Sequence, residues 1–80
     1  MTEAVVVDAR GHRCPVPTLR LQKAFAAAAP GTRLMLLATD PMAQIDAPHL
    51  MAQLGGQVLS IEETDGVLRI SVERPAAPPA

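Results

Sequence analysis

Apolar and polar positions follow patterns that predict two strands and a helix in the first half of the chain. Three consecutive valines within residues 3–8 form a β-branched run, typical of a strand buried on both faces. From Pro17 to about Ala29 apolar residues recur at helical spacing, which places Leu21, Ala24, Phe25 and Ala28 on the inner face. Residues 33–39 are almost continuously apolar and predict a buried central strand. A strand, helix and strand of this length form a right-handed crossover, so the two strands should be parallel.

Proline positions predict that residues 41–54 form a turn followed by a helix. Pro48 argues against one unbroken helix over residues 41–54, because an interior proline removes a backbone hydrogen bond. We expect a short turn at 41–45, where Met42 and Ile45 close the space above the sheet, and then a helix from Asp46 or Ala47. Its inner face should consist of Leu50, Met51 and Leu54, and Asp40 and Asp46 are interpreted as helix caps.

The last ordered stretch is typical of a β-hairpin. Asp65-Gly66 is a strong turn signal between two apolar stretches, residues 57–64 and 66–73, which predicts antiparallel strands with one face in the core. The core residues should be Val58, Leu59 and Ile61 from the first strand and Val67, Ile70 and Val72 from the second. We expect residues 1–74 to form one domain, followed by a disordered proline-alanine tail at 75–80.

The amino-acid composition excludes several classes of function. Apolar residues make up 49% of the 80 residues, but there is one Phe and no Tyr or Trp, so the core must be aliphatic. A net charge of −1 and the lack of stacking side chains argue against direct nucleic-acid binding. No apolar run approaches the roughly 20 residues that span a bilayer, so we expect no membrane segment. One cysteine and no apparent signal peptide indicate a reducing, cytoplasmic setting.

The single cysteine, Cys14, stands between the first strand and the first helix. A helix entrance and nearby cations both lower the pKa of a thiol, and Arg10, His12 and Arg13 all lie within four residues of it. Pro15 and Pro17 stiffen the turn at no cost in helix hydrogen bonds. These features favour a reactive thiol over the alternative, a small buried apolar residue.

Other chemistries of cysteine need partners that this chain does not offer. A zinc site would have to combine Cys14 and His12 with the distant His49, so we expect no metal and no cofactor. Hydrolase chemistry needs a base held by a third group, and no such group can be identified. A thioredoxin-type mechanism needs a second cysteine, which is absent.

The stretch from Asp8 to Pro17, with its Cys-Pro-x-Pro box, resembles the TusA/SirA-like sulfur carriers. Further landmarks in the same order are Pro30-Gly31, Asp40-Pro41, Asp46-x-Pro48 and Glu63-Thr64-Asp65-Gly66, so the resemblance covers about residues 4–73. It implies that the cysteine accepts a sulfane sulfur as a persulfide and passes it to a partner protein. It also implies a fold with two helices against a mixed four-stranded sheet.

We therefore expect a single two-layer α/β domain (an α+β sandwich), βαβαββ, with both helices on one face of a four-stranded mixed sheet. The expected function is that of a sulfur carrier: Cys14 takes sulfur from a cysteine desulfurase or rhodanese-like donor and yields it to an acceptor protein. Arg10 and Arg13 would stabilise the sulfur anion, with His12 as a further donor or cation. The protein would act stoichiometrically, as a monomer in transient complexes, rather than turn over a free substrate.

The resemblance associates such carriers with tRNA thiolation, cofactor assembly or sulfur oxidation, and two departures bear on the partner. Val16 replaces a residue that is often acidic in tRNA-thiolating members, and His12 one that is often apolar. The alternative function is a protein-binding or regulatory module that uses the same surface without sulfur chemistry.

Overall fold

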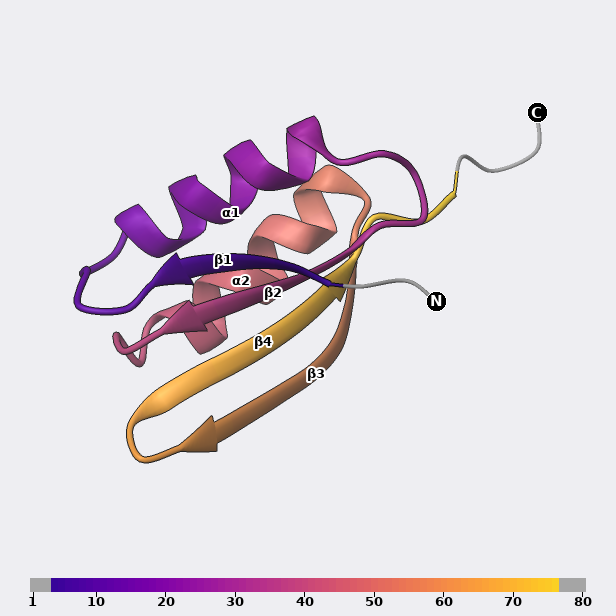
Figure 1. Ribbon diagram of the computed structural model, residues 1–80. Helices are drawn as coiled ribbons and strands as arrows, with labels where there is room; N and C mark the ends of the chain where they lie inside the picture. Colours follow the sequence, from indigo (N-terminus) through magenta and orange to yellow (C-terminus); the bar gives the residue numbers. More distant parts are fainter. Residues whose placement is uncertain (1–3, 77–80) are drawn as a thin grey trace.

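The computed structural model describes residues 4–76, which form two helices and one four-stranded sheet (Figure 1). The sheet order is β1-β2-β4-β3; β1 and β2 are parallel, and the other neighbours are antiparallel. This confirms the expected βαβαββ architecture. The elements are β1 (Val5–Ala9), α1 (Val16–Ala27), β2 (Arg33–Ala38), α2 (Ala43–Leu54), β3 (Gln57–Thr64) and β4 (Val67–Glu73).

Both helices pack on one face of the sheet, and the core lies between them. The register aligns Val7 with Leu36 and Leu36 with Ile70, and all three side chains are buried beneath the helices. From α1, Leu21 and Phe25 enter this core, with Ala24 and Ala28 packed at its margin as predicted. Among residues 4–76, neither 12-residue helix has the length and apolar character that crossing a bilayer requires.

Strand β1 differs from the prediction of a strand buried on both faces. Val5 is 46% exposed and Val6 is 59% exposed. The reason is position: β1 lies at the edge of the sheet and the helices cover only one of its faces, so only Val7 and Ala9 are buried. Residue 3, where the predicted strand begins, lies outside the described residues.

Helix α2 begins earlier than predicted and runs through Pro48. Its first turn is formed by i to i+3 hydrogen bonds, in which the amides of Ala43 and Gln44 donate to the carbonyls of Asp40 and Pro41, and it continues into the α-helix without a break. The expected separate turn and the expected cap at Asp46 are therefore wrong, because Asp46 lies inside the helix. Close packing on the sheet is provided by the small residues Ala43 and Ala47, whereas Met42, Ile45 and Leu54 are exposed.

The hairpin forms as predicted, with Asp65 and Gly66 at φ +52° and +79° in the turn. The prediction for its inner face needs correction. Leu68, not Val67, is buried together with Ile70 and Val72, and Leu59 and Ile61 are 44% and 41% exposed because β3 is the other edge strand. Of the predicted tail, residues 75 and 76 adopt no regular secondary structure. Residues 77–80 lie outside the described residues.

Candidate functional site

Cys14 lies in the loop between β1 and α1, at the end of the sheet where the parallel strands β1 and β2 have their carboxyl ends. Open α/β sheets commonly place their reactive groups at this edge. The thiol-bearing residue is half-buried, a cis peptide bond joins it to Pro15, and the next residue, Val16, begins α1. Pro17, in the first turn of the helix, is fully buried and so anchors the helix entrance to the core.

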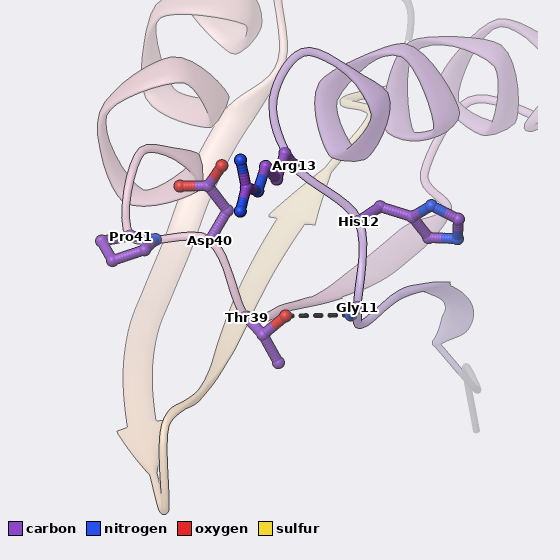
Figure 2. A pocket seen from close by; sticks show the side chains of 6 residues that line it. All are labelled: Gly11, His12, Arg13, Thr39, Asp40 and Pro41. Carbon is purple, nitrogen blue, oxygen red and sulfur yellow. Dashed lines mark hydrogen bonds between the residues drawn. The ribbon is translucent and has the colours of Figure 1, made fainter.

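Two hydrogen bonds join the Cys14 loop to the loop that follows β2. The amide of Gly11 donates to Oγ1 of Thr39 over 2.9 Å (Figure 2). The amide of Cys14 donates to Oδ2 of Asp40, also over 2.9 Å. Gly11 is at φ +81°, a backbone conformation in which side-chained residues are strained. Together the bonds fix the Cys14 loop at both ends.

A cavity of about 340 Å³ lies between these two loops and is open to solvent. Figure 2 shows the Arg13 side chain beside the Asp40 carboxylate, whereas the His12 ring points to the other side of the loop. Hydrogen bonds from the amides of Cys14 and Met42, and to a smaller extent the positive charge of Arg13, hold the pKa of Asp40 below its usual range. The residues that line the cavity are Gly11, His12, Arg13, Thr39, Asp40 and Pro41.

Carboxylates, rather than cations, dominate the electrostatics of the thiol. Burial, and then the neighbouring carboxylates of Asp46 and Asp40, raise the pKa of the Cys14 thiol to about 11. The expected lowering of this pKa is therefore wrong. Proximity in the sequence placed three cations near the sulfur, but the fold brings two acidic side chains from another loop and another helix to it.

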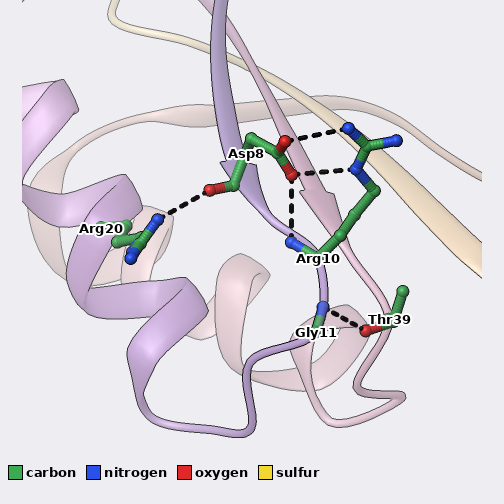
Figure 3. A network of polar contacts seen from close by, with 5 residues as sticks. All are labelled: Asp8, Arg10, Gly11, Arg20 and Thr39. Atoms are coloured by element: carbon green, nitrogen blue, oxygen red, sulfur yellow. Dashed lines mark hydrogen bonds and ion pairs between the residues drawn. The ribbon is translucent and has the colours of Figure 1, made fainter.

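The Arg10 side chain is paired with Asp8. Its guanidinium forms a two-pronged ion pair with the Asp8 carboxylate, with both nitrogen–oxygen distances 2.9 Å (Figure 3). Arg20 adds a hydrogen bond from Nη1 to the Asp8 carbonyl over 3.0 Å. This network braces the end of β1 against α1 and leaves Arg10 turned toward Asp8. The geometry gives no support to a role for Arg10 beside the sulfur.

Asp40 and Asp46 are the site residues that sequence reasoning missed, because both were interpreted only as helix caps. Asp40 does accept the Met42 amide over 3.0 Å at the start of α2, but its second oxygen binds Cys14. A signal was available in the sequence: two parallel strands end at the same edge, so the residues after β2 must lie near those after β1. Within residues 4–76, no three His, Cys, Asp or Glu side chains gather in an arrangement that could hold a metal ion.

The fold and the site define a class of small two-layer domains that present one thiol at the carboxyl edge of a parallel strand pair. Comparison with known proteins identifies the family. The family model described as Sulfurtransferase TusA matches residues 5–74. A putative sulfur carrier protein of Archaeoglobus fulgidus is 40% identical over 68 residues, which cover 84% of this chain and 88% of that protein.

Further relatives support the same family assignment. The sulfur carrier protein TusA of Pseudomonas aeruginosa is 35% identical, with 82% of this chain and 86% of that protein covered. The crystal structure of a SirA-like protein from Desulfitobacterium hafniense superposes with a TM-score of 0.80 at 25% identity and covers 89% of this chain and 97% of that one. The chain therefore belongs to the TusA family.

Proposed function

We propose that this protein is a sulfur carrier in which Cys14 holds the transferred sulfur as a persulfide. The observation that carries the proposal is the placement of the chain's one cysteine in a braced loop at the sheet edge, in a member of the TusA family. A second cysteine is absent from the sequence, so a persulfide here has no internal thiol with which to form a disulfide.

The transfer step balances without an added oxidant or reductant. The Cys14 thiolate attacks the outer sulfur of a persulfide on a donor protein, a new sulfur–sulfur bond forms, and the donor's own sulfur–sulfur bond breaks. The donor cysteine leaves as a thiolate and takes up the proton that Cys14 lost. Delivery repeats the exchange with a thiol of an acceptor protein, which restores the Cys14 thiol. The partners are therefore a sulfur-donor protein and a sulfur-acceptor protein.

Four supporting side chains keep roles within this proposal. Pro15 and Pro17 set the turn that presents the sulfur, and the buried Pro17 fixes that turn to the core. Arg13, beside Asp40, places a positive charge at the rim of the site. His12 points away from Asp40 and is open to a docked partner.

The test is the intact mass of the purified protein after incubation with a sulfane-sulfur donor. We expect a gain of one sulfur, about 32 Da, which a reductant removes and prior alkylation of Cys14 prevents. Cys14→Ser should fold normally and gain nothing. Because the thiol pKa is about 11, loading should also be faster at pH 9 than at pH 7.5. Failure to gain mass at either pH would contradict the proposal.

The raised thiol pKa is also the observation that favours the second candidate, a protein-binding or regulatory module. A thiol that stays protonated at neutral pH is a weak nucleophile. Alkylation separates the two functions. A module binds its partner equally well after Cys14 is capped, whereas a carrier with capped Cys14 transfers no sulfur at all.

A further inference from the structure

Asp40 makes contacts that exceed what a helix cap requires. One carboxylate oxygen accepts the amide of Cys14 over 2.9 Å, and the other accepts the amide of Met42 over 3.0 Å. The same residue's carbonyl accepts the Ala43 amide in the first turn of α2. A single side chain, 26 positions along the chain from Cys14, therefore ties the backbone of the thiol-bearing residue to the start of α2.

The charged groups around the sulfur come from three parts of the fold. Asp40 lies on the loop between β2 and α2, Asp46 lies in the first turn of α2, and Arg13 precedes Cys14 on its own loop. Both carboxylates oppose a negative charge on the sulfur. Arg13 offsets Asp40 in part, and the two backbone amides keep Asp40 itself ionised well below neutral pH.

We propose that Asp40 is a positioning residue for sulfur transfer: its carboxylate fixes the loop that carries Cys14 and at the same time opposes an anion on the sulfur of the free carrier. This inference rests on the proposed carrier function and adds to it a means of keeping the empty thiol inert. The sulfur becomes a stronger nucleophile when the charge of Asp40 is offset or its contact with the loop changes. Asp40 would thus act through Cys14 and need not touch the donor.

The experiment measures the rate of Cys14 alkylation by iodoacetamide against pH, which requires no sulfur donor. Asp40→Asn removes the charge but keeps one acceptor oxygen, and we expect the midpoint of its profile to fall by about one pH unit. The thiolate fraction at pH 7.5 then rises about tenfold, and the weaker nucleophilicity of a more acidic thiol reduces the gain in rate to about threefold. Asp40→Ser also keeps an oxygen without charge and should shift the profile in the same direction.

Two comparisons separate this role from simple capping of α2. Glu73→Gln removes one negative charge at the far end of β2 and β4 and should leave the midpoint unchanged. Thermal unfolding of each variant reports any loss of the cap. If Asp40→Asn and Asp40→Ser melt at lower temperature but keep the wild-type midpoint, Asp40 is only structural and the inference is overturned.

The outcome is independent of the test of function. A protein that gains no sulfur mass but shifts its alkylation profile in Asp40→Asn would overturn the carrier proposal and leave the coupling of Asp40 to Cys14 intact. A protein that gains sulfur mass while both Asp40 variants keep the wild-type profile would support the carrier proposal and overturn the role of Asp40.

Discussion

Arg10 illustrates how far a residue's neighbours in space can differ from its neighbours in sequence. Four positions separate it from Cys14, yet its guanidinium is bound to Asp8, and this pairing holds the pKa of Asp8 at about 2, below its ordinary value of 3.8. Because the folded pKa is depressed, the pairing favours the folded state above pH 3.8 and ceases to do so as the pH falls through 2. The exposure of both side chains keeps the effect small.

Replacing Arg10 should therefore change Asp8 and leave the thiol alone. In Arg10→Gln we expect the pKa of Asp8, measured by NMR titration, to rise toward 3.8, while the alkylation profile of Cys14 stays as in the wild type. The control is Arg13→Gln, which removes a positive charge next to Asp40. A clear change in the Cys14 profile of Arg10→Gln would show that Arg10 reaches the sulfur after all.

At the scale of elements, the local patterns predicted each helix and strand but not where α2 begins or which strands lie at the edges. The Asp65-Gly66 turn and the helical spacing in α1 depend on residues close in sequence, so they could be recognised. The rule against an interior proline failed at Pro48, where α2 begins upstream with hydrogen bonds around Asp40 and continues through the proline. The exposure of Val6 and Leu59 depends on strand order, which no local pattern contains.

The end of α1 depends on a residue from the far end of the chain. Nη1 of Arg74 donates to the carbonyls of Phe25, Ala26 and Ala28 over 2.8–3.2 Å, and its guanidinium carbon lies 5.5 Å from the centre of the Phe25 ring. The last carbonyls of a helix have no partner within the helix, so a cation placed there both caps the helix and complements its dipole.

Loss of this cap should destabilise the fold without affecting the thiol. We expect Arg74→Met, which keeps an apolar stem, to lower the free energy of unfolding by about 2 kcal/mol and the melting temperature by roughly 10 °C. Calorimetry or circular dichroism measures both. Arg33→Met is the matched control. The Nε of the exposed Arg33 side chain lies 3.6 Å from a carboxylate oxygen of Glu73, and its loss should change stability by less than about 0.5 kcal/mol. Equal effects of the two substitutions would contradict this account.

At the scale of the whole molecule, the site exists only when the domain is folded. Sequence reasoning found Cys14 and its proline-stiffened loop, because these are continuous in the chain. It missed the acidic surroundings, because Asp40 and Asp46 reach the thiol only after β2 pairs with β1 and α2 packs on the sheet. The charge around Cys14 is thus a property of tertiary structure.

Unfolding should therefore activate the thiol. In the unfolded chain its pKa returns to about 9.0 from about 11, so at pH 7.5 alkylation in urea should be about tenfold faster than in the native protein. Glutathione in the same urea solution corrects for the solvent. Since the folded state holds the thiol proton more tightly, stability should also fall as the pH rises from 9 to 11. Equal alkylation rates in the native and unfolded states would mean that folding does not raise the pKa of the Cys14 thiol.

The carboxylates beside Cys14 have a consequence for survival in the presence of oxidants. Peroxides attack cysteine as the thiolate and convert it, through sulfenic acid, to forms that cannot accept sulfur. In the native chain the sulfur stays protonated, so Cys14 should be oxidised slowly. Damage should concentrate in molecules that have partly lost their structure, so oxidised Cys14 would mark the misfolded fraction of the protein.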